Sequence, residues 1–561
     1  MVKKFFVLLI AISMLITSFA GCGGQTQEPD EPTPAAAETA DAPAEQKPEP
    51  ITLTFFNGFP AGNQPAEEGN MTEKWYEEKT GVKLKIERLV GDLNTKVGVM
   101  ISSGDYPDLI YGHEAHQKFV DAGAVVPMND MIEKMGPNIK KLYGDINLNK
   151  LKKDDGNIYF ISPYRESSPI QRPASGMWIS KAVLKEFNWP LPKTLDEYFD
   201  LLIKYYQKYP QIDGKKTIGF EMCTDSWRFF TVANPPSYLM GYPNDGGVIV
   251  NDQTYEAKDF STMEESKRYF KKLNDVFKVG LIDKESFVAN YDQYIARLSS
   301  GRVLGMYDQQ WQMQPANDAL LKAGMGDNLF VALPIVYDQG IQEQYNYQGS
   351  FGVRDGISIS SKCKEPERAM QFIDFICTDE AQVVNMWGFK DETYAVDANG
   401  KFSRTQEMRD KSSDPEYRAK TGLGQFEYPW PRGVWDEKYA DGNTRNPSAD
   451  PDEVMIGYQD AEKEVLKAYD IKTLTDLFKL SKAKIWGVAW DIPMPDDSPA
   501  KIANTKMSDT QRIYLPQLIM AKDGQFDAIW DEYTDKMNNT GREAYVEFIN
   551  KGIMDRVNKW K

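Results

Sequence analysis

The two histidines are the first residues in this sequence that could do chemistry. They stand in GHEAHQ as His113 and His116, with Glu114 directly after the first. The zinc-protease motif HExxH needs its histidines on one helix face, separated by one more residue than here. We therefore expect both histidines to be surface loop residues. The sequence also lacks a GxSxG elbow, a Walker loop and a GxGxxG after a strand, so a nucleophile-and-base enzyme is unsupported.

A second candidate is the segment Gly424–Trp435, which reads GQFEYPWPRGVW. Its four aromatic side chains stand among prolines and glycines, where neither a helix nor a strand runs easily. Glu427 and Arg432 lie between the rings. Such a mixture on a stiff loop suits carbohydrates, because their C–H faces lie on aromatic rings and their hydroxyls need planar hydrogen-bond partners.

Two interpretations of this segment are open. In the first, Tyr428 and Trp430 are stacking platforms, and Arg432 binds hydroxyls or a uronate carboxylate. In the second, the rings fill the seam between one lobe and the C-terminal helices. For Phe426 and Trp435 we favour this second interpretation.

The other candidate ligand-binding residues come from segments that a strand could deliver to a cleft. They are Asn57 after ITLTFF, Trp227 and Arg228 in CTDSWRFF, and Asp308, Gln309 and Trp311 in YDQQW. YDQQW follows an apolar strand and therefore lies at its carboxyl end, where open α/β sheets bind ligands.

The elements that position these residues have clear patterns. ITLTFF alternates apolar and polar residues, and so does the stretch from Val82 to Glu87, which predicts two strands. PDLIYG at 107–112 predicts a third. Helical segments separate these strands, which favours a parallel, wound sheet and an α/β fold class. Thr194 and Glu197 have capping-box spacing before a helix.

Length and charge limit the class of protein. With 561 residues the chain is too long for one core, so we expect two lobes. The formal net charge of −17 would repel nucleic acids and anionic membranes.

The amino terminus has the composition of an export signal. MVKK is a basic start, and the apolar run FFVLLIAISMLITSFA is short for a membrane span. Ala20 and Gly21 then precede Cys22, which resembles the lipobox of bacterial lipoproteins. We expect a signal peptide at 1–21, lipidation of Cys22, and a proline-rich disordered tether at 22–50 that holds the folded part at the extracellular face of the cell membrane.

Seven further segments, in this order, carry a resemblance to a known family. They are SSGDYPDLIYG (102–112), DAGAVVPMND (121–130), GNIYFISPY (156–164), SGMWISKAVLKEFNWPLPKTLDEY (175–198), GRVLGMYDQQW (301–311), KCKEPERAMQFIDFICTDEAQ (362–382) and WGFKDETYAVDANGKF (387–402). Together they resemble extracellular solute-binding proteins of the large maltodextrin-binding type (family 1), specifically the long lipoprotein subgroup of oligosaccharide ABC importers.

This resemblance implies a periplasmic-binding-protein-like fold of type II, with the ligand cleft between two α/β lobes. It places 51–162 and 327–378 in the first lobe, and 163–326 and 379–561, including extra C-terminal helices, in the second. It implies a monomeric, non-enzymatic receptor that captures an oligosaccharide, which we expect to come from a plant polysaccharide, and passes it to ABC permease subunits.

The same resemblance raises the question of a metal. Long members of the family often carry a calcium loop after the helix that begins near Thr194. Here that place reads YPQIDGKKTIGF, in which Asp213 is the only carboxylate. Since calcium takes several oxygen ligands, we predict no metal there and expect no cofactor.

Alternatives stay open at this stage. A surface-anchored carbohydrate-active enzyme would need a pair of carboxylates beside the sugar, and 83 acidic residues do not single out two. A peptide receptor would rely on backbone pairing more than on aromatic platforms. Whether a sugar ligand is neutral or acidic is also open, since Arg165, Arg172, Arg228 and Arg432 could read an acid or pair with the protein's own carboxylates.

Overall fold

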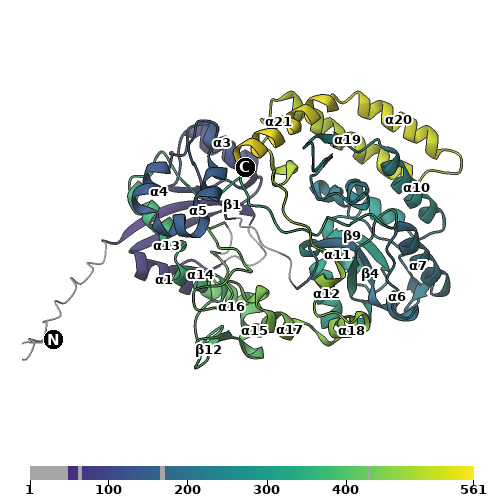
Figure 1. Ribbon diagram of the computed structural model, residues 1–561, viewed down its shortest axis with the longest axis horizontal. Helices are drawn as coiled ribbons and strands as arrows, with labels where there is room; N and C mark the ends of the chain where they lie inside the picture. Colours follow the sequence, from purple (N-terminus) through teal and green to yellow (C-terminus); the bar gives the residue numbers. More distant parts are fainter. Residues whose placement is uncertain (1–48, 61–65, 164–170, 427–428, 561) are drawn as a thin grey trace, which may run out of the picture. The chain divides into compact units, whose positions relative to one another are not determined.

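Two hydrophobic cores organise the folded part of the chain. The computed structural model describes residues 49–60, 66–163, 171–426 and 429–560, and Pro48–Lys561 form one compact unit. Figure 1 shows the ribbon of this unit as two lobes. Two buried clusters lie in lobe 1 and a third, larger one lies in lobe 2. The predicted two-lobed α/β architecture is confirmed. The predicted signal peptide, Cys22 and the tether up to residue 48 lie outside the described residues.

Lobe 1 is built on a four-stranded sheet in the order β11-β3-β1-β2. The strands are β1 (Ile51–Pro60), β2 (Val82–Leu89), β3 (Leu109–Tyr111) and β11 (Ser358–Ile359). β1 runs parallel to both β2 and β3, as the alternation of strands and helices predicts, and β11 joins the edge in the antiparallel direction.

The alternation of residues along β1 divides lobe 1 into two buried layers. Leu53 and Phe55 enter one cluster, whereas Phe56 enters another, because successive strand residues point to opposite faces. Helices cover both faces. The first layer contains residues of α1 (Met71–Thr80), α4 (Asn129–Met135), α5 (Pro137–Leu151) and α13 (Pro366–Ile376), and the second contains residues of α2 (Leu93–Ser103) and α3 (His116–Asp121).

Lobe 2 has a three-stranded sheet in the order β10-β4-β9. Its strands are β4 (Ser175–Ser180), β9 (Gly305–Gln309) and β10 (Phe330–Leu333), and both pairings are antiparallel. Around it lie α6 (Lys181–Glu186), α7 (Leu195–Lys208), α10 (Glu264–Lys278), α11 (Tyr291–Leu298) and α12 (Gln310–Lys322). The predicted capping box of Thr194 and Glu197 is present at α7.

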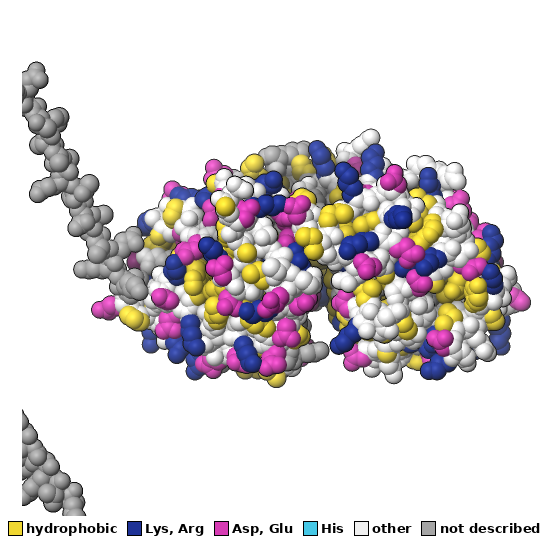
Figure 2. Space-filling model, turned by 90° about the horizontal axis from the view of Figure 1, so that it is seen from below, with side chains coloured by type: hydrophobic (Ala, Val, Ile, Leu, Met, Phe, Trp, Pro, Cys, Tyr) yellow, Lys and Arg dark blue, Asp and Glu magenta, His cyan; other side chains and the backbone are white. Residues whose placement is uncertain are grey.

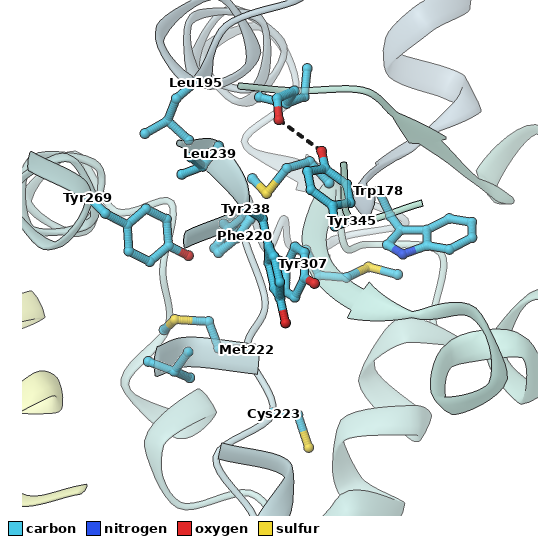
Figure 3. Close-up of a cluster of buried hydrophobic side chains, with 14 of the residues drawn as sticks. Trp178, Leu195, Phe220, Met222, Cys223, Tyr238, Leu239, Tyr269, Tyr307 and Tyr345 are labelled. Atoms are coloured by element: carbon cyan, nitrogen blue, oxygen red, sulfur yellow. Dashed lines mark hydrogen bonds between the residues drawn. The ribbon is translucent and has the colours of Figure 1, made fainter. Parts of the chain in front are cut away.

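Aromatic side chains fill the centre of lobe 2. Tyr238 and Tyr307 stack with ring centroids 5.2 Å apart, and Tyr345 packs beside them (Figure 3). The buried hydroxyl of Tyr345 donates to the carbonyl of Ile335 at 2.8 Å, which satisfies its polar end. Tyr345 is therefore part of the core of lobe 2.

The chain passes between the lobes at other points than the sequence suggested. Residues 327–378 were expected in lobe 1, but β10 pairs with β4, and Tyr345 lies in the core of lobe 2. Residues from 379 onward were expected in lobe 2, but Phe426 and Trp430 lie in the core of lobe 1. The apolar run FVAL forms β10 and completes the sheet of lobe 2. Tyr345 is still in the core of lobe 2 and Phe351 is in the core of lobe 1, so the chain returns to lobe 1 only after residue 346.

The last three helices pack mainly on lobe 2. They are α19 (Pro499–Ile519), α20 (Phe526–Asn538) and α21 (Arg542–Trp560), and α19 lies against α10 (Figure 1). The end of α21 also reaches lobe 1, where Trp560 packs against its core and the Lys559 ammonium pairs with Asp154 at 2.5 Å. The C-terminal helices therefore contact both lobes.

Charged side chains of both signs are interspersed on the face seen in Figure 2. Elsewhere in the described structure, charged side chains form ion pairs at the surface, as Lys185 does with Asp327 and Arg268 with Asp338. This face therefore does not present a field of one sign, even though the whole chain carries a net charge of −17.

His116 corrects the expectation that both histidines are surface residues, because it is completely buried. Its Nδ1 accepts a hydrogen bond from the Gly112 amide at 3.0 Å, and its Nε2 lies 2.9 Å from the Ser358 hydroxyl. Ser358 in turn donates to the carbonyl of Tyr159, so Nε2 carries the proton. Burial lowers the pKa of His116 to about 3.

Replacement of His116 by glutamine should reduce the acid sensitivity of folding. The unfolded chain protonates His116 near pH 6.5 and the folded chain does not until about pH 3, so the wild type loses stability as pH falls below 6.5. Between pH 7 and pH 5 the wild type should lose about 2 kcal/mol more than H116Q, as measured by guanidinium denaturation. The carboxylates are the same in both proteins, so equal losses would contradict a neutral buried histidine.

Candidate functional site

Two exposed tryptophans of lobe 2, both predicted to bind ligand, stack on each other at the surface. Trp227 lies in the 3-10 helix η2 (Ser226–Phe229), and Trp311 lies in the first turn of α12. Their rings stack with centroids 5.9 Å apart and an interplanar angle of 17°. The exposed fractions are 56% for Trp227 and 55% for Trp311, so this pair, called the platform below, offers apolar surface to a ligand.

Arg228 stands beside the platform between two rings. Its guanidinium carbon lies 4.6 Å from the ring centre of Trp227 and 4.1 Å from that of Tyr291. Tyr291 begins α11, and its own hydroxyl donates to the carbonyl of Gln312 at 2.7 Å. The ring contacts therefore hold the cation in place next to the two tryptophans.

Asp308 holds these elements together from below. It is fully buried at the end of β9, where its carboxylate accepts hydrogen bonds from the Tyr294 hydroxyl at 2.6 Å and the Gln312 amide at 2.8 Å. Burial raises the pKa of the Asp308 carboxyl to about 7. The prediction that Asp308 contacts ligand is therefore corrected, because its side chain lies inside the lobe and positions α11 and α12. The next residue, Gln309, is half-buried and donates its backbone N–H to Asp308 at 2.7 Å.

The lobe 1 edge of the site lies at the carboxyl ends of β1 and β3. Asn57 is there, as predicted, but it is 8% exposed, and its side-chain oxygen accepts from the Phe59 amide at 3.0 Å. The Phe59 ring packs 5.3 Å from the ring of His113, which follows β3. β1 continues past Asn57 to Pro60 with a shift of register between these two residues, so the side chain of Asn57 binds the irregular end of its own strand.

A pocket of about 180 Å³ adjoins the chain that returns from lobe 2 to lobe 1. Its lining combines aromatic, acidic and basic side chains: Tyr347, Ser350, Phe351, Gly352, Arg354, Asp355, Val488, Trp490 and Asp491. Trp490 is 46% exposed, and the Arg354 guanidinium lies 5.7 Å from its ring centre. Asp355 accepts hydrogen bonds from Tyr111 and Arg354, and Asp491 pairs with Arg556 at 2.5 Å.

Sequence reasoning missed Arg354 and Trp490 as candidates. Trp490 stands in GVAWDIPMP, where a tryptophan near prolines and an acid is the same signal that drew attention to Gly424–Trp435. Arg354 gave no comparable signal, because nothing in its neighbourhood along the chain distinguishes it from the other arginines.

The aromatic segment Gly424–Trp435 belongs mainly to the core of lobe 1. Trp430 is 1% exposed, and its ring lies 4.7 Å from that of Phe55, so its predicted role as a stacking platform is wrong for this structure. Phe426 is buried in the same cluster, where its ring packs on Tyr76 of α1, so it fills the core of lobe 1 and not a seam with the C-terminal helices. Tyr428 and Glu427 lie outside the described residues.

Arg432 is held at the edge of this segment. Its Nε donates to the carbonyl of Pro163 at 3.0 Å, and its guanidinium carbon lies 5.0 Å from the ring centre of Trp435. Pro163 belongs to the first connection between the lobes. The structure therefore engages Arg432 with its own chain, and a role in ligand binding stays a prediction.

The place considered for calcium is a tight hairpin. β5 (Gln211–Ile212) pairs with β6 (Lys215–Lys216), and the turn residues Asp213 and Gly214 both have positive φ. Across the described ranges no group of three His, Cys, Asp or Glu side chains is arranged to hold a metal ion. Within the same ranges no helix has the length and apolar character of a membrane span.

Comparison with known proteins identifies the relatives of this chain. Residues 74–390 match the model of the family described as bacterial extracellular solute-binding protein. The fructooligosaccharide ABC transporter substrate-binding protein FusA of Streptococcus pneumoniae is 23% identical over 500 residues, which are 85% of this chain and 85% of FusA.

Solved structures agree on the fold. FusA in complex with kestose has a TM-score of 0.65 and 19% identity to this chain, and the match covers 90% of this chain and 99% of that one. An HMO-binding solute-binding protein associated with an ABC transporter, from Bifidobacterium longum infantis, also has a TM-score of 0.65, with 17% identity over 90% of this chain and 98% of that one. At these identities the likeness shows the fold alone.

Alanine substitution should separate the buried tryptophan from the exposed one. Trp430→Ala removes a ring from the core of lobe 1 and should lower the free energy of unfolding by about 3–5 kcal/mol. Trp311→Ala removes a half-exposed ring and should cost about 1 kcal/mol or less. Calorimetric unfolding of both variants beside the wild type is the measurement, and equal losses would contradict this assignment.

Proposed function

Because the chain belongs to the bacterial extracellular solute-binding protein family, we propose that it is a lipid-anchored receptor that captures an oligosaccharide for an ABC importer. The family match spans more than half of the chain, and FusA, which matches most of it, is named as a substrate-binding protein of a fructooligosaccharide ABC transporter. We further propose that the oligosaccharide comes from a plant polysaccharide.

The observation that carries the proposal is the platform of Trp227 and Trp311. Its stacked rings are more than half exposed, Arg228 lies beside the Trp227 ring, and Gln309 ends β9 two residues before Trp311. Sugars bind to such a surface through C–H faces on the rings and hydroxyls on the planar polar groups. Of the candidate residues, Trp227, Arg228, Gln309 and Trp311 are those we propose to contact ligand.

Capture then follows from the two-lobed architecture. Contacts from a ligand to both lobes stabilise a closed state by the difference in affinity between open and closed forms. We propose that Trp490 and Arg354 meet the ligand from the pocket beside the connection between the lobes. The closed receptor is the form that we expect the permease subunits to recognise.

A carbohydrate-active enzyme is the alternative from another class. The relatives are named as substrate-binding proteins, which supports a receptor without catalysis. Asp355 and Asp491 are the acids that line the pocket, and each is engaged by an arginine of the protein itself. A paired-acid mechanism needs two carboxylates that are free to flank the glycosidic bond, and both of these acids are bound to arginines of the protein.

Binding should depend on the platform. A thermal-shift screen of the chain from residue 49, against neutral and uronate-containing plant-wall oligosaccharides, should give a rise in melting temperature with at least one of them. Trp311→Ala and Trp227→Ala should each weaken that binding by about tenfold or more in calorimetry. Ile146→Ala, which removes an exposed apolar side chain from α5, is the matched control and should bind like the wild type.

Mass spectrometry of the recovered ligand distinguishes the alternatives. An intact ligand supports the receptor, whereas a shortened or unsaturated product would replace it with the enzyme. Binding that is unchanged in both tryptophan variants would remove the platform from the site, and the absence of any shift across the panel would favour a peptide ligand.

Lipidation can be tested separately at Cys22. When the full chain is expressed in a bacterium that processes lipoproteins and is fed labelled palmitate, the protein should carry the label and sediment with membranes. Cys22→Ser should be unlabelled and released. The lipid is attached to a cysteine sulfur, and Cys22 is the cysteine at the predicted cleavage point. An unlabelled, released wild-type protein would contradict the anchor.

A further inference from the structure

We propose that the platform takes an acidic oligosaccharide, with the Arg228 guanidinium pairing with a carboxylate of the sugar. This inference rests on the proposed function and specifies its substrate class. It starts from the one arginine that the described structure leaves without a polar partner for its side chain.

The arginines of the described residues are otherwise engaged by the protein. Each of the others donates from its guanidinium to a carboxylate, an amide or a carbonyl of the chain: Arg88, Arg172, Arg268, Arg297, Arg302, Arg354, Arg368, Arg404, Arg409, Arg418, Arg432, Arg445, Arg512, Arg542 and Arg556. Arg228 makes no such bond within the described part, and its Nε is buried without a partner. Some of these arginines, such as Arg302 and Arg512, donate to carbonyls and not to acids, so Arg228 differs from the others in having no hydrogen-bond acceptor at all within the described part.

The rings beside Arg228 explain why it stays available. The guanidinium carbon of Arg228 lies 4.6 Å from the ring centre of Trp227 and 4.1 Å from that of Tyr291, so the cation is held by two rings and not by a hydrogen-bond acceptor. The N–H donors of a guanidinium lie in its plane, so ring stacking leaves them for a planar acceptor. A carboxylate fits this fork with two parallel hydrogen bonds, which a single hydroxyl cannot do.

The two acids nearest Arg228 accept hydrogen bonds from other groups of the protein, and a second cation lies close by. Asp225 is the nearest acid along the chain, and its carboxylate accepts from the Tyr291 backbone N–H at 3.0 Å. Asp308 is buried below, where burial raises the pKa of its carboxyl to about 7 and thus reduces its negative charge near neutral pH. Arg512 adds a second cation, because it donates to the carbonyl of Ser226, and its guanidinium lies 4.9 Å from the Phe229 ring centre.

Closure over a ligand makes the charge of the ligand matter. When a lobe closes over the platform, Arg228 loses the water that now solvates it. Burial of an unpaired cation is costly, whereas burial of a hydrogen-bonded ion pair is compensated by its own attraction. A neutral sugar would leave the cost in place, and a uronate would remove it.

Paired ligands provide the test. The probes are oligogalacturonates and oligoguluronates of three to six residues, each measured by calorimetry against its methyl ester, which keeps the sugar skeleton and removes the charge. The acid form should bind at least about tenfold more tightly than its ester in 50 mM salt, and the difference should shrink at high salt.

Variants locate the effect at Arg228. Arg228→Gln should lose about tenfold or more of the affinity for the acid and little of the affinity for the ester, and Arg228→Lys should keep part of the preference because it keeps the charge. Arg302→Gln is the matched control, since Arg302 precedes the opposite end of β9 and binds the carbonyl of Lys216. It should bind like the wild type. Thermal unfolding of each variant checks that it is folded.

The outcomes separate this inference from the function on which it rests. Acid and ester binding equally, or an unchanged preference in Arg228→Gln, would overturn the acidic ligand. Binding of neutral oligosaccharides alone, lost in Trp311→Ala, would also overturn it and leave the receptor intact. Failure of every acidic and neutral oligosaccharide would contradict both.

Discussion

The candidate site depends on one buried carboxyl group, that of Asp308. It lies at the end of β9 and accepts hydrogen bonds from Tyr294 of α11 and Gln312 of α12. Tyr291, whose ring contacts Arg228, belongs to α11, and Trp311 of the platform belongs to α12. A single buried acceptor therefore positions both rings. A buried carboxylate is costly unless several donors converge on it, and here the Gln309 backbone supplies one more. The surface that faces a ligand is thus held by a polar network inside the lobe.

A buried polar side chain also fixes one connection between the lobes. Asn346 stands where the chain leaves lobe 2, and its side-chain oxygen accepts from the backbone of Ala174 at 2.7 Å, while its amide donates to Ser175 at 2.8 Å. The backbone N–H of Asn346 donates to Glu343. One buried side chain therefore ties the returning chain to the start of β4. Along this connection, the backbone is therefore fixed to lobe 2 as far as Asn346.

Much of the fold could be predicted from local patterns. The period of two in ITLTFF gave a strand and also its two faces, with Leu53 and Phe55 in one layer and Phe56 in the other. The capping box at Thr194 marked the start of α7. The path between lobes was less accessible, since FVAL is a strand in either lobe, and only its pairing with β4 decides which. Likewise, the surroundings of His116 could not be read from GHEAHQ.

The sequence by itself determined the class of fold, its order of elements and the presence of aromatic and arginine side chains that suit a sugar. Tertiary structure decided which of them face outward. Trp430, in the segment richest in rings, is inside lobe 1, whereas Trp311, with the same chemistry, is half exposed. The physical reason is that propensity and periodicity act over a few residues, while burial and charge pairing depend on partners far along the chain, as Phe55 is for Trp430. Only the tertiary structure shows that, among the described arginines, Arg228 is the one whose side chain has no hydrogen-bond acceptor.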